Sequence, residues 1–171
     1  MVLVAIVYLA RKSPPSQPNS VATSASERAG PADIYPIASM TPGATNPDVT
    51  QENIGKTICN PHWSTKSVRP PAEYTNRLKR EQLGEYGARD RNLRDYEEDH
   101  LIPLELGGNP RDPDNLWPEA YATSIGDGGA RNKDKVENYL HDQVCSGAMP
   151  LAVAQQRIAT DWYRVYVAAI R

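Results

Sequence analysis

The chain has 171 residues, which is enough for one domain with its own hydrophobic core. Its net charge of −2 at pH 7 and its isoelectric point near 5.9 argue against a protein that coats nucleic acid through overall positive charge. The distribution of charge along the chain is therefore more informative than its sum.

The first 31 residues differ in composition from the rest. An apolar run over 1–10 is followed by Arg11, Lys12 and a tract rich in Ser, Pro, Ala and Thr. Ten apolar residues are fewer than the roughly 20 that span a bilayer, so we expect no stable membrane span. A secretory signal fits the apolar run, although no basic residue precedes it. We favour export, as a periplasmic, secreted or N-terminally anchored protein, over a cytoplasmic chain, with a flexible linker before a single domain over 32–171.

Turn-forming residues dominate 33–71 and predict irregular structure that wraps the domain. His62 has no partner at metal-ligand spacing there, so we interpret it as structural. Two prolines then precede a predicted helix over 72–83, on which Tyr74 and Leu78 lie one turn apart.

A basic region covers this helix and its flanks. Residues 66–94 include eight basic and four acidic side chains, a local net charge of +4. Such a patch could face phosphates, and it could equally be a solvated helix face. Its candidate nucleic-acid contacts are Arg77, Lys79 and Arg80.

The stretch YEEDHLIPLELGGNPRDPDNLWPE over 96–119 combines acidic residues, a histidine and two glycines. Asp99 and His100 are adjacent, and a carboxylate beside an imidazole can hold a divalent cation and activate a water. Both reach one site only if the strand is distorted or ends there. We interpret Glu97 and Glu98 as exposed strand-edge residues, with attraction of the cation as the alternative.

The residues after His100 predict a short strand or hairpin arm that ends at Gly107 and Gly108. The apolar positions that indicate it are Leu101, Ile102, Leu104 and Leu106. The loop over 109–118 contains three prolines, so we expect an ordered turn that fixes Asn115.

Two helices are predicted near the C-terminus, over 130–145 and over 151–170. In the second, apolar residues recur at helical spacing and must pack on another element. These positions are Leu151, Ala154, Ile158, Trp162, Val165 and Ala169.

Cys59 and Cys145 are the two cysteines. Paired C-x-x-C ligands are absent from the sequence, so we do not expect a zinc knuckle. A disulfide between them would suit an exported protein, whereas two free buried thiols are the alternative.

DHLIPLELGG followed by NLWPE resembles the motif of the HNH endonucleases, over about a quarter of the chain. The resemblance implies an α+β fold in which a ββα-metal (His-Me) finger, with its motif core over about 96–145, is surrounded by further helices. The chain also resembles small bacterial secreted or envelope-associated HNH-like proteins that have an upstream cysteine and a VCSG segment.

The family resemblance also implies roles for particular residues. His100 is the expected general base, Asp99 a metal ligand, and Asn115 the residue that ties the loop to the strand. The last ligand is expected on the helix after the hairpin, where Asn132 is our choice, with Asp134 and His141 as alternates. Arg131 and Lys133, on the same helix, are candidate phosphate contacts.

The sequence thus predicts a metal-dependent endonuclease that hydrolyses DNA, with RNA as an alternative substrate, and that uses a single Mg²⁺ ion. Mn²⁺ and Zn²⁺ are alternative ions. A non-catalytic envelope or binding protein with the HNH fold is the second hypothesis. The intact Asp99, His100 and Asn115 favour the enzyme, whereas the modest basic patch and the acidic isoelectric point favour the binding protein.

Overall fold

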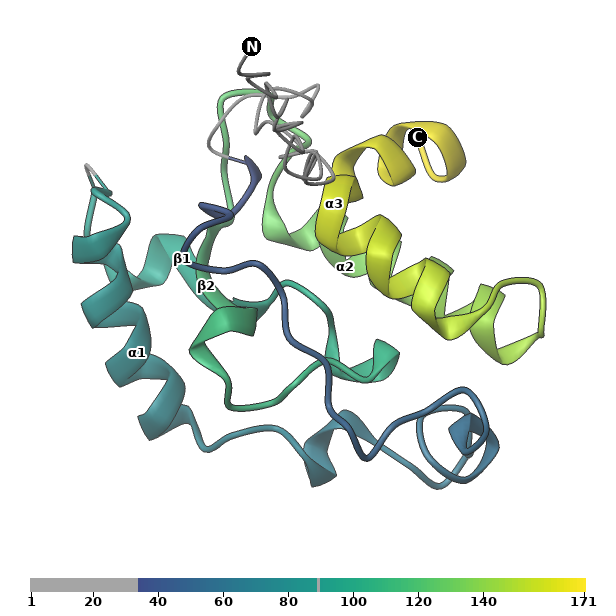
Figure 1. The fold of residues 1–171 in the computed structure, drawn as a ribbon. Coiled ribbons are helices and arrows are strands. Elements are labelled where there is room, and N and C mark those ends of the chain that lie inside the picture. Colours follow the sequence, from purple (N-terminus) through teal and green to yellow (C-terminus); the bar gives the residue numbers. More distant parts are fainter. Residues whose placement is uncertain (1–33, 89) are drawn as a thin grey trace, which may run out of the picture.

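The computed structural model describes residues 34–88 and 90–171, so the predicted signal and linker over 1–31 lie outside the described residues. The described part is an α+β structure with three α-helices and one two-stranded antiparallel sheet (Figure 1). In chain order its elements are α1 (Ala72–Glu85), β1 (Tyr96–His100), β2 (Leu116–Ala120), α2 (Ala130–Cys145) and α3 (Leu151–Ala169).

The hairpin is formed by an acidic strand, not by the apolar run that was expected to form it. In β1, Tyr96 pairs with Ala120 of β2 and His100 pairs with Leu116. The expected strand over 101–106 is wrong, because the chain bends after His100 and forms a 3-10 turn over Leu104–Leu106. The apolar side chains there are buried without alternating between two faces of a sheet.

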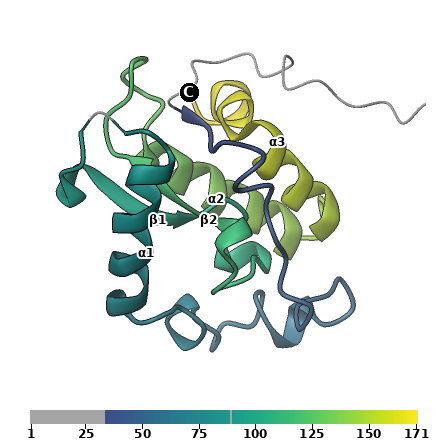
Figure 2. The same cartoon turned by 60° about the vertical axis from the view of Figure 1, so that its left-hand side comes forward.

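The hairpin lies between α1 on one side and α2 with α3 on the other (Figures 1 and 2). The buried face of α1 consists of Lys79, Gln82 and Leu83, and Tyr74 and Leu78 are only half-buried. Gln82 donates a hydrogen bond to the carbonyl of Leu116 at 2.9 Å. The helix is thereby attached to β2 by a polar contact rather than by the predicted apolar stripe.

The main core lies between α2 and α3. Val136, Leu140 and Val144 of α2 are fully buried, as the helical spacing predicts. They belong to one hydrophobic cluster with the buried residues of α3, which are Leu151, Ala154, Ile158, Trp162 and Tyr166. The indole of Trp162 is buried in this core and donates to the carbonyl of Ile34 at 2.9 Å.

The apolar stripe of α3 changes phase at Asp161. This residue has non-helical backbone angles, φ −160° and ψ 75°, and its carboxylate accepts the backbone N–H of Arg164 at 2.9 Å. Asp161 therefore caps the last part of the helix as an N-cap residue does. Beyond the kink Tyr166 is buried, while Ala169, expected on the stripe, is exposed.

The segment before α1 is irregular, as predicted, and its described residues contain short 3-10 helices and one isolated β-bridge, between Thr45 and Gly108. A disulfide joins Cys59 of this segment to Cys145 at the end of α2, with 5.4 Å between the two Cα atoms. Among the described residues, no helix has both the length and the apolar character needed to cross a membrane.

Candidate active site

Asp99 and His100 lie in one cleft at the end of β1. Neighbouring residues on a strand point to opposite faces, but β1 ends at His100 and the chain then bends, so both residues line the same space. The cleft has a volume of about 280 Å³. Its charged or titratable lining residues are Arg69, Asp99, His100, Glu105, Asp134 and Glu137.

The His100 ring is buried and its tautomer is fixed by the loop. His100 Nε2 lies 3.1 Å from the carbonyl oxygen of Pro110. A carbonyl oxygen only accepts, so Nε2 carries the hydrogen and Nδ1 keeps its lone pair. Burial lowers the pKa of His100 below its usual value, although the neighbouring Asp99 opposes that shift. At neutral pH the ring is thus an uncharged imidazole with a basic Nδ1.

Asn115 holds the loop that carries Pro110. Its side chain is fully buried, accepts the N–H of Ile102 at 2.9 Å, and donates to the carbonyls of Ile102 at 2.9 Å and Asn109 at 3.1 Å. It makes no direct hydrogen bond to His100 among the described contacts, so it acts on the ring through the loop. Gly108 allows the close packing here, since a Cβ atom would lie 1.7 Å from the Ile102 carbonyl oxygen.

Lys133 is buried beside the cleft and contacts three of its lining residues. Its side chain has no exposed surface, and its Nζ lies 2.5 Å from Asp99 Oδ2, 2.5 Å from Glu137 Oε1 and 2.9 Å from the carbonyl of His100. Burial alone would lower the pKa of Lys133, but the carboxylates raise it well above the usual value, Asp99 most of all. Burial would likewise raise the pKa of Asp99, but the charge of Lys133 and the hydrogen bonds from Glu119 and Lys133 together lower it below the usual value. Lys133, expected as a phosphate contact, is instead an internal cation.

Acidic groups outnumber cations around Lys133. Glu97, Asp99 and Glu119 each place a carboxylate oxygen within 4.8 Å of the others, on the face of the hairpin toward α2. The carboxyl group of Glu119 is buried, and burial raises its pKa well above the usual value, so that its protonated form can donate a hydrogen bond to Asp99. Burial also raises the pKa of Glu97 to about 6 and that of Asp134 above its usual value. A bound cation would therefore stabilise the ionised forms of these carboxylates.

The expected third ligand lies elsewhere. Asn132 donates to the carbonyl of Asp127 at 3.0 Å and accepts from Lys135 at 2.8 Å, and it does not line the cleft. Of its two alternates, Asp134 lines the cleft, whereas His141 lies beside the disulfide. Glu137, which the sequence analysis did not select, also lines the cleft.

The other basic candidates divide into buried and exposed groups. Lys79 is buried, and its ammonium donates to the carbonyls of Leu93 and Tyr96 at 2.9 and 2.8 Å, so it is not available to a phosphate. Arg77 and Arg80 on α1, and Arg131 on α2, are exposed.

Two exposed arginines that were not selected lie close to the site. Arg69 lines the cleft itself. Arg111 follows Pro110, the partner of His100, and its guanidinium lies 5.5 Å from the centre of the Tyr74 ring, which Arg77 also approaches at 5.7 Å. Besides the buried Lys133, the basic groups on this side of the molecule therefore come from two loops and from α1.

A comparison of this chain with models of known families, with curated proteins and with solved structures finds no match in any of the three. The function is therefore argued from the chemistry of the site.

Proposed function

We propose that the protein is a metal-dependent endonuclease that hydrolyses phosphodiester bonds in DNA, with RNA as a second possible substrate, and that β1, β2 and α2 form a ββα-metal finger of the HNH type. The observation that carries the proposal is the state of His100. An uncharged ring, with Nε2 bonded to Pro110 and Nδ1 left basic, lines the same cleft as Asp99. A general base requires this protonation state at neutral pH.

The donor groups of the cleft fit a hard divalent cation. Carboxylate oxygens are the ligands that Mg²⁺ and Mn²⁺ prefer, and Asp99, Asp134 and Glu137 all line the cleft. Lys133 uses one oxygen of Asp99 and one of Glu137, and each carboxylate has a second oxygen. These three residues would hold the ion once their carboxylates move together, since among the described residues it is Glu97, Asp99 and Glu119 whose carboxylates lie within 4.8 Å of one another. Asp134 would take the place first expected for Asn132. A bound Mg²⁺ would neutralise charge on the phosphate and the leaving oxygen.

The remaining chemistry comes from the chain. His100 Nδ1 would accept a proton from the attacking water while Nε2 keeps its hydrogen bond to Pro110, so the ring becomes an imidazolium without turning. Lys133 holds Asp99 and the backbone of His100 together, which fixes the base relative to the carboxylate. Arg69 offers a guanidinium to the phosphate from the wall of the cleft.

The nucleic acid would lie across the exposed arginines next to this cleft. Arg77 and Arg111 flank the Tyr74 ring, and Arg69 lies at the cleft. Such contacts reach phosphates and carry no sequence information, so we expect little sequence preference. Arg80 and Arg131 would extend the basic surface, whereas Lys79 and Lys133 would not take part.

Plasmid nicking tests the proposal. The purified oxidised chain is incubated with supercoiled plasmid and Mg²⁺, Mn²⁺ or EDTA, beside the variants His100→Ala and His62→Ala. His62 is exposed and lies outside the cleft, so it is the matched control. We expect nicking that requires metal, is lost in His100→Ala and is retained in His62→Ala. Nicking by His100→Ala at the parent's rate would disprove the assigned base.

The second candidate is a non-catalytic binding protein with the same fold. It is favoured by Lys133, whose ammonium already supplies a cation to Asp99 and Glu137. Absence of cleavage by folded protein with every metal tested, together with retarded migration of DNA, would favour this candidate.

We also propose that the protein works outside the cytoplasm. The disulfide between Cys59 and Cys145 supports this, because such bonds persist in oxidising compartments. Fractionation of cells that produce the full chain would test it, and recovery only from the cytoplasm with free thiols would contradict it.

A further inference from the structure

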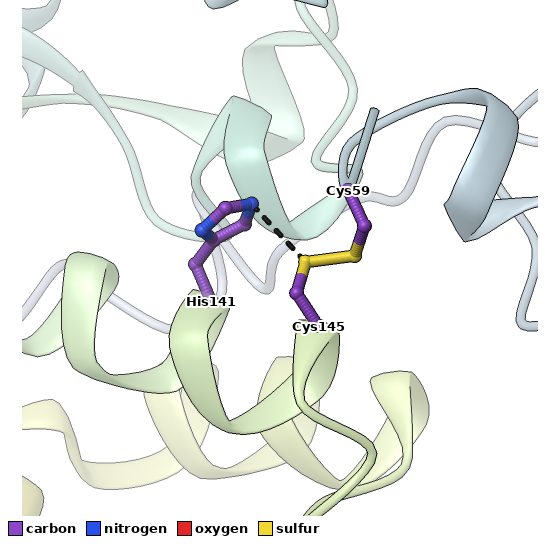
Figure 3. A group of neighbouring side chains, drawn as sticks. All are labelled: Cys59, His141 and Cys145. Atoms are coloured by element: carbon purple, nitrogen blue, oxygen red, sulfur yellow. Dashed lines mark hydrogen bonds between the residues drawn. A yellow bond between two sulfur atoms is a disulfide. The ribbon is translucent and has the colours of Figure 1, made fainter. Parts of the chain in front are cut away.

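A second group of potential metal ligands includes the disulfide itself, and the cavity that it lines shares only Thr65 and Glu105 with the cleft at His100. Cys59, His141 and Cys145 each place a ligand atom within 4.8 Å of the others. His141 and Cys145 lie one turn apart on α2, and Figure 3 shows the His141 ring directed at the sulfur of Cys145. The distance from His141 Nε2 to Cys145 Sγ is 3.4 Å.

These three residues line a cavity of about 370 Å³. Cys145 is exposed, so a reductant can reach its sulfur. Glu105 also lines this cavity, and its Oε1 is buried without a hydrogen-bond partner. The site thus contains two sulfurs, one imidazole and one unpaired carboxylate oxygen, although the sequence separates them by up to 86 residues.

The two sulfurs bind metal only after reduction. A disulfide sulfur is uncharged and is a weak ligand, whereas a thiolate is a strong one. Zn²⁺ prefers two thiolates and an imidazole as ligands, with a carboxylate or water completing a tetrahedron. We propose that the reduced chain holds one thiophilic divalent cation of the zinc class at Cys59, His141 and Cys145, with Glu105 or water as the fourth ligand.

A phosphine can reduce the disulfide before the metal binds. The phosphine breaks the S–S bond, water supplies the oxygen of the phosphine oxide, and the two sulfurs become thiols. Binding of the cation then displaces both thiol protons to solvent. In the oxidised chain the Nε2 hydrogen is donated to the carbonyl of Ile58 at 2.9 Å. For Nε2 to bind the cation, this hydrogen must move to Nδ1, which lies 3.9 Å from the carboxylate of Asp142.

The test uses Co²⁺ and Zn²⁺ as probes with the full chain. Oxidised and phosphine-reduced protein are titrated with Co²⁺, and thiolate-to-cobalt absorption, circular dichroism and the melting temperature are recorded. We expect the band only after reduction, saturation of the band at one thiolate-bound ion per chain, loss of the band on addition of Zn²⁺, and a larger rise in melting temperature with metal for the reduced chain than for the oxidised chain. Folding of a reduced chain on addition of metal would also support the site.

Variants separate this site from the cleft. His141→Gln is expected to weaken binding by at least about tenfold, since even the loss of an outer partner costs roughly 10- to 100-fold. His62→Gln, an exposed control, and His100→Gln, in the cleft, should leave the band unchanged. A reduced chain that gives no thiolate band, or a His141→Gln variant that binds as tightly as the parent, would overturn the proposal. Neither result bears on DNA cleavage by the oxidised protein.

Discussion

Lys133 Nζ lies 2.5 Å from Asp99 Oδ2, and no part of the Lys133 side chain reaches solvent. A second buried lysine, Lys79 of α1, donates to the carbonyl of Tyr96 at the other end of β1. The strand is thus held at both ends by ammonium groups from the two helices that flank the hairpin. The end at Lys133 carries the candidate site, so stability and activity should depend together on this residue.

Replacement of Lys133 by Met should lower the free energy of unfolding by about 3–5 kcal/mol, because the buried carboxylate of Asp99 loses its partner. Urea denaturation measures the loss. Lys135→Met on the same helix is the control, since Lys135 is exposed and should contribute less than about 1 kcal/mol. Equal losses in the two variants would contradict the central role of Lys133.

Asn115→Ala should destabilise the protein and reduce cleavage. The variant leaves the N–H and the carbonyl of Ile102 without their partner, at a cost of about 1–3 kcal/mol for each buried group. It also frees the loop that positions Pro110, so nicking should slow even at temperatures where the variant is folded. Asn60→Ala, which removes one exposed hydrogen bond to the N–H of His62, should do neither. Full activity in folded Asn115→Ala would show that the loop does not orient His100.

The identity of the third ligand can be decided by metal dependence. Asp134→Asn should raise the Mg²⁺ concentration needed for half-maximal nicking, because Asp134 lines the cleft with Asp99. Asn132→Ala should leave that concentration unchanged, since its side chain bonds Asp127 and Lys135. The reverse pattern would restore Asn132 as the ligand.

The apolar periodicity predicted the helices well, but the burial of the charged residue Lys133 was not predicted. The bounds of α2 agree with the predicted 130–145, because Val136, Leu140 and Val144 define one buried stripe. Lys133 lies three residues before Val136 and continues that stripe, which was the available signal for its burial. The Glu137 carboxylate one turn later was the second signal.

The hairpin was harder to predict because long-range contacts decide it. The apolar residues after His100 suggested the strand, yet the acidic YEEDH segment forms it. Lys133 pairs with Asp99 at one end of this strand, and Lys79 donates to the carbonyl of Tyr96 at the other, a relation that no local pattern contains. The pairing of Cys59 with Cys145 was inferred from the expected compartment, and the position of His141 beside it was not foreseen.

Removal of the disulfide by mutation should destabilise the protein only under oxidising conditions, in which the parent forms the bond. The crosslink joins residues 86 positions apart in the sequence. In the chain-entropy model, a loop of that length raises the free energy of unfolding by about 4–5 kcal/mol. Cys59→Ser should therefore unfold at lower urea than the oxidised parent. In a metal-free phosphine buffer the two proteins should unfold together. An unchanged midpoint under oxidising conditions would show that the bond does not stabilise the fold.

Glu98 provides a test of the buried charge on the other face of the hairpin. Both of its side-chain oxygens are buried without a hydrogen-bond partner. Burial, with the nearby Asp99, raises the pKa of Glu98 to about 8. Between the usual pKa of a glutamate, about 4.5, and this value, the folded chain binds more protons at Glu98 than the unfolded chain does. The contribution of Glu98 to stability must therefore fall as pH rises through this range.

Glu98→Gln keeps the shape of the protonated acid and removes its titration. The variant should match the parent near pH 5 and be more stable than the parent near pH 8.5, where the buried carboxylate of the parent ionises. Urea midpoints at the two pH values measure the difference, with the exposed Glu81→Gln as a control that should show no such change. If the gap between Glu98→Gln and the parent is the same at both pH values, folding does not raise the pKa of Glu98.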